Sequence, residues 1–143
     1  MRRIIVVLLF VVLLGVACGA DEEAMSVRDV SLTATDIAYD VAQLAVPANQ
    51  PVRLTLVNDG VLEHDFTIRE IAVADVHAPA ASEADDHAMS EDVHDLALHV
   101  AAPASGGQAV LEFTPTEAGE YEYYCTVSGH KEAGMVGTLV VGP

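Results

Sequence analysis

The sequence has 143 residues, a length that corresponds to one domain with additional segments. Hydrophobic residues make up 52% of the chain, which is enough for a core, and 22 acidic residues against 6 Lys and Arg give a formal net charge of −16. This charge excludes the basic surface that nucleic-acid binding needs, and it favours basic partners.

Residues 1–17 have the features of an export signal. Arg2 and Arg3 form a short positive segment, and an unbroken apolar run from Ile4 to Leu14 follows it. The run is shorter than the ~20 apolar residues that a membrane-spanning helix needs, and its length suits the core of a secretory signal peptide. A permanent transmembrane anchor is the competing interpretation.

Cys18 follows the apolar run and a few small residues, and this junction resembles the lipobox of bacterial lipoproteins, in which cleavage precedes a lipid-modified Cys. Gly15 stands where that motif usually has Leu, and ordinary cleavage near Ala17 or Ala20 is the alternative. Two acyl chains are sufficient for stable membrane anchoring. We therefore expect a membrane-anchored lipoprotein in the periplasm or on the outer face of the cytoplasmic membrane, or otherwise a secreted or periplasmic protein.

Cys18 and Cys125 are the two cysteines of the chain. A disulfide between them would join the signal-peptide boundary to the end of the domain, so lipid attachment to Cys18 and metal ligation by Cys125 are the favoured roles. Residues 18–30 are small and acidic without periodicity, which indicates a flexible tether to a membrane surface, or a disordered segment with no role.

From residue 31 onward, short strand patterns alternate with turn signals, which is typical of a β-sandwich or barrel. In one of these patterns, alternation places His64, Phe66 and Ile68 on the inner, apolar face. His64 therefore points inward at the start of a strand, where an isolated histidine would be interpreted as part of the core. The expected strands cover residues 30–39, 44–46, 52–56, 64–69, 96–100, 119–125 and 135–141, with turns over residues 47–51 and 58–60.

Residues 74–95 interrupt the strand patterns and are interpreted as an inserted acidic loop. A helix here would place His87, Glu91 and His94 on one face, as a candidate weak second site for copper or zinc. A solvated acidic loop, or a docking surface for a basic partner, is the simpler interpretation. His99, in the strand pattern that follows, is interpreted as structural.

Near the C-terminus, Cys125, His130 and Met135 follow one another with four residues in each interval. Alternation places Cys125 at the end of a strand, on the same inner face as Tyr121 and Tyr123. Alone, Met135 would be interpreted as a core residue. A thiolate, two imidazoles and a weak axial thioether form the ligand set that suits blue copper, and an inward histidine earlier in the chain would supply the second imidazole.

This C-terminal sequence resembles the second half of the cupredoxins, the plastocyanin- and azurin-like type 1 copper proteins. The spacing is nearest to that of members with longer loops, such as auracyanin and rusticyanin. Over residues 31–143, the resemblance implies an all-β, Greek-key β-sandwich that binds one copper ion for one-electron transfer. The residues that carry it are Thr114-Pro115, Gly119-Glu120-Tyr121, Tyr123, Cys125-Thr126, Ser128-Gly129-His130, Gly134-Met135 and Gly137-Thr138-Leu139.

The resemblance implies copper ligation by His64, Cys125, His130 and Met135. Ser128 stands where many members of the family have Pro, and Asp65 stands where Asn is common. In the family, the side chain at that second position ties the two ligand-bearing loops together by hydrogen bonds.

The leading hypothesis is therefore a blue copper protein that carries single electrons between redox partners outside the cytoplasm. A c-type cytochrome with a basic face and a membrane electron-transfer complex are the expected kinds of partner. The rival hypothesis is an extracytoplasmic protein that binds or delivers copper. Catalysis is not expected, because Thr126 rather than a histidine follows Cys125, and a dinuclear centre would need a second Cys in the loop.

Overall fold

The computed structural model describes residues 26–78 and 96–143, which form ten β-strands and no helix. No helix within these ranges could cross a membrane. The predicted signal peptide, the predicted lipid-attachment residue Cys18, and the candidate second site of His87, Glu91 and His94 lie outside the described residues. The strands are β1 (Arg28–Thr35), β2 (Ala38–Tyr39), β3 (Gln43–Pro47), β4 (Val52–Asn58), β5 (His64–Ile68), β6 (Val73–His77), β7 (Leu98–Ala102), β8 (Gly107–Pro115), β9 (Gly119–Tyr124) and β10 (Val136–Gly142).

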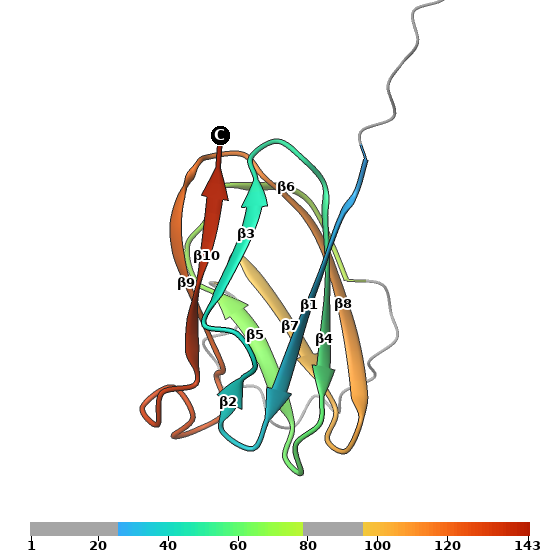
Figure 1. Ribbon diagram of the computed structural model, residues 1–143, viewed down its shortest axis with the longest axis vertical. Coiled ribbons are helices and arrows are strands. Elements are labelled where there is room, and N and C mark those ends of the chain that lie inside the picture. Colours follow the sequence, from blue (N-terminus) through green and yellow to red (C-terminus); the bar gives the residue numbers. More distant parts are fainter. Residues whose placement is uncertain (1–25, 79–95) are drawn as a thin grey trace, which may run out of the picture.

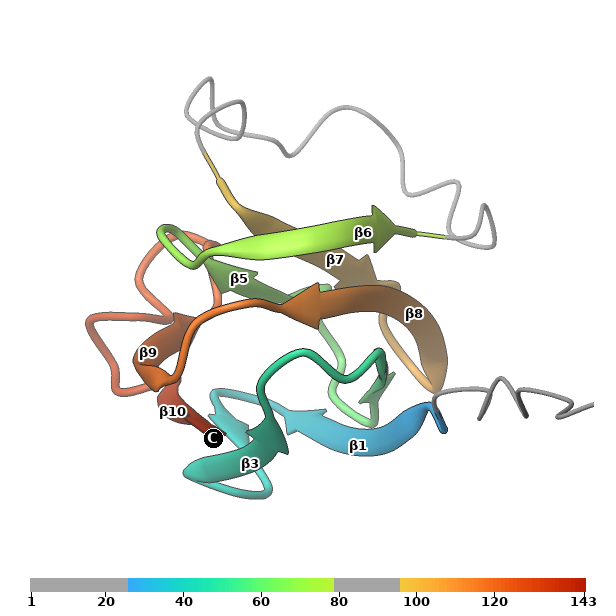
Figure 2. The ribbon, with the colours of Figure 1, turned by 90° about the horizontal axis from the view of Figure 1, so that it is seen from above.

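The strands form two five-stranded sheets, which confirms the predicted all-β sandwich. We call the sheet with strand order β2-β1-β4-β8-β6 the first sheet, and the sheet with order β3-β10-β9-β5-β7 the second sheet. β1 with β4 and β3 with β10 are parallel pairs, and the other paired strands are antiparallel. Seen from above, the sheets curve around a common interior (Figure 2).

Two strands extend into segments that were expected to be irregular. β1 begins at Arg28, inside the predicted tether of residues 18–30, because its first residues pair with the start of β4. β6 occupies the first part of the predicted insert of residues 74–95 and pairs with β8. β6 is an edge strand, and its pairing with β8 shifts register, as is tolerated at a sheet edge. Four of its five residues are exposed, so its sequence lacks the alternation of a half-buried strand.

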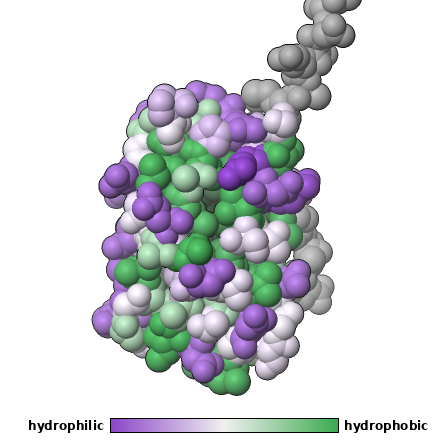
Figure 3. Space-filling model, viewed as in Figure 1, coloured by the Kyte–Doolittle hydropathy of each residue, from purple (hydrophilic) through white to green (hydrophobic). Residues whose placement is uncertain are grey.

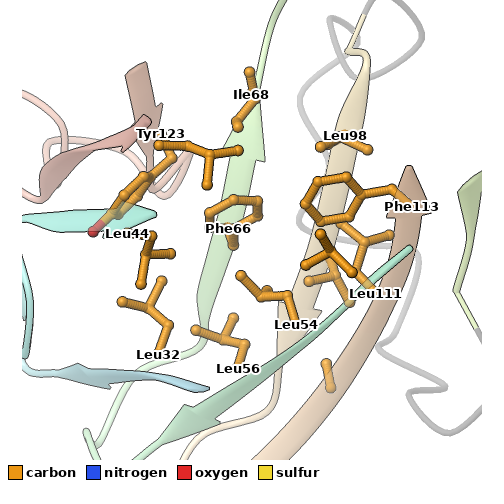
Figure 4. Packing of buried hydrophobic residues seen from close by; sticks show 14 of the residues in the cluster. Leu32, Leu44, Leu54, Leu56, Phe66, Ile68, Leu98, Leu111, Phe113 and Tyr123 are labelled. Carbon is orange, nitrogen blue, oxygen red and sulfur yellow. The ribbon is translucent and has the colours of Figure 1, made fainter. Parts of the chain in front are cut away.

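The core lies between the inner faces of the two sheets (Figure 4). Leu54 and Leu56 from β4 and Leu111 and Phe113 from β8 face Phe66 and its neighbours on the second sheet. Each such side chain contributes about 1.5–3 kcal/mol by its burial. β8 alternates in burial as far as Phe113, although no strand was predicted there.

Tyr123 fills the core beside the second sheet and depends on a glycine opposite it. Its ring packs against Phe66 at 5.2 Å between centroids, and its hydroxyl donates a hydrogen bond to the Val41 carbonyl at 2.6 Å. A Cβ atom on Gly137 would lie 2.1 Å from the Tyr123 ring, so the aromatic side chain requires glycine at that position of β10.

The β4–β5 connection and the β9–β10 connection lie at the same end of the sandwich (lower end in Figure 1). We call this the loop end. The start of β5 and the last residues of β9 therefore approach each other where the chain leaves the second sheet. This arrangement brings segments that are 61 residues apart in sequence into one site.

Candidate metal centre

The strand ends of the second sheet place three of the four predicted ligands at the loop end, in buried positions. His64 is the first residue of β5, Cys125 directly follows β9, and His130 lies in the loop between β9 and β10. Their exposed fractions are 0%, 0% and 6%. Burial of these polar side chains indicates a site that is closed to bulk water.

The ring nitrogens and the sulfur are close enough to share one ion. Cys125 Sγ lies 3.9 Å from His64 Nδ1 and 3.6 Å from His130 Nδ1, and all three ligand atoms lie within 4.8 Å of one another. Bonds of roughly 2.3 Å to sulfur and 2.0 Å to nitrogen, lengths known from zinc sites, separate trigonal ligand atoms by about 3.7 Å. The observed spacing therefore fits a trigonal metal centre with one thiolate and two imidazoles, the set that suits copper.

Met135 is fully buried next to these residues and directly precedes β10. Its backbone N–H donates to the His130 carbonyl at 2.9 Å, and its carbonyl accepts from the Cys125 N–H at 3.2 Å. These bonds hold Met135 between the other two ligands of the loop. Its role as the axial ligand stays a prediction that this placement supports.

The ligand loop between Cys125 and Met135 is a compact series of turns. His130 N–H donates to the Val127 carbonyl at 3.0 Å, and the Ala133 N–H donates to the Gly129 carbonyl at 3.0 Å. Gly129 and Gly134 have φ values of 82° and 102°, a region that favours glycine. The loop is therefore ordered by its own backbone, with Ser128 in the position where Pro is common in the family.

Asp65 connects β5 to the ligand loop. Its carboxylate accepts the Thr126 N–H at 2.9 Å and the Thr126 hydroxyl at 2.6 Å, while its backbone carbonyl accepts the Tyr39 hydroxyl at 2.5 Å. The side chain is 4% exposed, so these bonds replace water around a buried carboxylate. The tie that the family resemblance implied at this position is therefore present with Asp.

Burial also sets the protonation of the ligands. Burial, followed by the negative charge of Asp65, raises the pKa of the Cys125 thiol to about 11, so the metal-free side chain is a neutral thiol at neutral pH. Burial, followed by the neighbouring His130, lowers the pKa of His64, which keeps that ring neutral and able to donate its lone pair. Metal binding must therefore displace the thiol proton.

Known proteins have sequences similar to that of this chain. Residues 5–141 match the family model of the cupredoxin-like domain. The chain belongs to the cupredoxin-like family. The copper-resistant cuproprotein CopI of Rubrivivax gelatinosus is 35% identical to this cupredoxin over 121 residues, which cover 84% of this chain and 70% of that protein. CopI of Pseudomonas aeruginosa is 27% identical over 149 residues, which cover 85% and 80%.

Auracyanins are a second group of similar proteins. Auracyanin-B of Chloroflexus aurantiacus is 33% identical over 114 residues, which cover 75% of this cupredoxin and 48% of that protein. A solved auracyanin B structure superimposes with a TM-score of 0.63 at 26% identity, over 81% of this chain and 89% of that chain. The family, the fold and the clustered ligands agree, and copper is the cofactor of this protein.

The family resemblance pointed to Asp65, but the sequence did not reveal Thr67, the polar residue that supports it. Thr67 accompanies Asp65 on the outer face of β5, and all five residues of that strand are buried. The alternation of β5 marks one apolar face, and it does not show that the polar residues on the other face are buried as well. His99, which was interpreted as structural, contacts this group through a strand pairing that no sequence pattern specifies.

Proposed function

We propose that this cupredoxin carries single electrons between redox partners outside the cytoplasm. The observation that carries the proposal is the buried set of His64, Cys125 and His130, whose ligand atoms are already spaced for one ion. Bound copper supplies the one-electron change between Cu(II) and Cu(I). The chain's contribution is to hold the same ligands in the same places in both states.

The surroundings of the ligands support such rigidity. Asp65 fastens the ligand loop to β5, and backbone hydrogen bonds within the loop fix the position of His130. Asp65 lies in β5 and the ligand loop begins at the end of β9, and both strands are hydrogen-bonded within the second sheet. A ligand set that moves little when the electron arrives requires little rearrangement of its surroundings, which favours fast transfer.

The loop end also offers a surface on which a partner can approach the site. Ile37, Val61 and Leu62 are exposed at 47%, 75% and 50%, and they lie in the connections β1–β2 and β4–β5 at that end (Figure 1). On the face shown in Figure 3, hydrophobic and hydrophilic residues are interspersed. Apolar residues at the end of the sandwich where His130 also lies would allow close contact between a partner and the edge of the site.

The charge of the chain supports a basic partner. With a net charge of −16, the protein attracts positively charged surfaces over about 10 Å at 0.1 M salt. A c-type cytochrome with a basic face or a membrane electron-transfer complex is the kind of partner that we propose. Export through residues 1–17 and attachment by a lipid on Cys18 would place the protein at a membrane surface, where such partners lie.

Binding or delivery of copper outside the cytoplasm is the second candidate function. It is favoured by the two relatives that are copper-resistant cuproproteins in Rubrivivax gelatinosus and Pseudomonas aeruginosa. The two functions differ in what leaves the site. An electron carrier retains the ion through many redox cycles, whereas a delivery protein transfers the ion itself to an acceptor.

Voltammetry and stopped-flow mixing separate these candidates. The copper-loaded protein should show a reversible one-electron wave and should reduce or oxidise a basic c-type cytochrome at a rate that falls with added salt. Leu62→Ser, at the loop end, should slow this reaction, while Val27→Ser, at an exposed site before β1, should leave it unchanged. Irreversible voltammetry together with transfer of the ion to a copper chelator would contradict the electron carrier and support the delivery protein.

A further inference from the structure

A row of three residues crosses the second sheet close to the copper-ligand residues. Thr67 in β5 is directly opposite His99 in β7 and opposite Tyr124 in β9. Thr67 is fully buried, and its Oγ1 lies 2.9 Å from His99 Nδ1 and 3.0 Å from Asp65 Oδ1. A threonine hydroxyl thus connects a histidine to the carboxylate that holds the ligand loop.

The direction of these hydrogen bonds follows from the number of protons. Asp65 Oδ1 accepts from Thr67, so the single hydroxyl proton of Thr67 points to the carboxylate. The Thr67 oxygen must then accept from His99, which places the proton of that neutral ring on Nδ1. Nε2 of His99 is buried and has no partner among the described residues, as suits a nitrogen without a proton. Burial lowers the pKa of His99, in agreement with a neutral ring.

The Asp65 carboxylate therefore receives donors from two sides. Thr67 donates from its own strand, and Thr126 donates both its N–H and its hydroxyl from the ligand loop. Thr126 directly follows the ligand Cys125, so any rotation of the carboxylate is transmitted to the sulfur through one residue. Hydrogen-bonded groups outside the ligands orient the ligands and tune a metal centre in this way.

We infer that His99 and Thr67 are positioning residues for the copper-ligand loop. His99 fixes the orientation of the Thr67 hydroxyl, and Thr67 fixes the carboxylate of Asp65 in the rotamer that accepts both donors of Thr126. The network lies in the metal-free chain and does not depend on electron transfer. It assigns to His99, in a strand that contributes no ligand, an effect on the copper site.

Amide hydrogen exchange of Thr126 in the copper-free, full-length protein measures this tie directly. Thr67→Val keeps the shape of the side chain and removes both hydrogen bonds, so exchange at Thr126 should become about tenfold faster. Thr67→Ser should restore the slow exchange, since the hydroxyl returns. Thr55→Val is the matched control, because it makes the same substitution at a half-buried position of β4 in the first sheet.

The histidine is tested in the same assay and in the copper-loaded protein. His99→Phe removes the donor and should accelerate Thr126 exchange several-fold, and His99→Asn, whose amide can donate from a similar place, should restore it. The visible thiolate-to-copper band and the reduction potential should shift in His99→Phe and Thr67→Val, and stay in place in the rescue and control variants.

The outcomes decide between positioning and a general effect on folding. Wild-type exchange at Thr126 in Thr67→Val would overturn the inference, and so would equal acceleration in Thr55→Val. If His99→Phe does not fold, the isosteric Thr67→Val and its serine rescue still decide the role of Thr67. Comparison of Thr126 exchange in His99→Asn with that in His99→Gln then decides the role of the Nδ1 donor.

Discussion

The two sheets of the sandwich contribute different things to the protein. The inner face of the first sheet is almost entirely aliphatic and aromatic, as in Leu54, Leu56 and Phe113. The second sheet provides strand ends for His64 and Cys125, and it buries Asp65 and Thr67 on its outer face. The first sheet therefore supplies packing, and the second combines packing with a hydrogen-bonded ligand site. Substitutions in the two sheets should have separable effects.

The largest expected effect is that of Cys125→Ser on the copper site. The intense visible band depends on the thiolate, so this variant should lose the band and bind Cu(II) orders of magnitude more weakly. Its metal-free fold should persist, because serine is close in size to cysteine. Ser128→Ala, in the same loop, should retain the band. An unchanged spectrum in Cys125→Ser would show that Cys125 is not a copper ligand.

Leu54→Ala should show the opposite pattern. Truncation of this fully buried side chain in the first sheet should lower the free energy of unfolding by about 2–5 kcal/mol. Urea unfolding of the copper-free protein measures this loss, and the absorption spectrum of the folded, copper-loaded variant should match that of the wild type. A displaced band in Leu54→Ala would show that the copper geometry depends on packing in both sheets.

Asp65→Ala should affect both stability and the site. Thr126 would lose the acceptor for its N–H and its hydroxyl, at a cost of about 1–3 kcal/mol in the free energy of unfolding. The visible band should shift as well, since the loop is released from β5. Asp65→Asn is the control that keeps one acceptor oxygen, and its unfolding midpoint should lie between those of Asp65→Ala and the wild type.

A smaller, graded effect is expected from pH. The pKa of the Cys125 thiol is raised to about 11 by burial, so the metal-free protein holds this proton at neutral pH while the copper-bound thiolate does not. Loss of one proton on binding makes the apparent affinity rise about tenfold per pH unit wherever the imidazoles are neutral. Calorimetry in buffers of different ionisation enthalpy should count one released proton near pH 8, and a count of zero would contradict the buried neutral thiol.

Alternation predicted the inward placement of His64 and Cys125, because strand ends and inward faces are local properties of the sequence. His64 and Cys125 were placed on inner faces, and the structure buries both of them side by side. The Thr67–His99 contact depends on the register between β5 and β7, which joins residues 32 positions apart and leaves no local pattern. β6 was not recognised for a related reason, since an exposed edge strand has no apolar face to reveal it.

The approach of His64 to Cys125 across 61 residues has a consequence for folding. An ion that bonds to both residues cross-links the folded chain and is released on unfolding, so its binding adds to the free energy of unfolding. Since the assembled site exists in the folded state, free copper at 100 times its dissociation constant would add about 2.7 kcal/mol to stability. The stability of the folded protein would then rise with the supply of the metal.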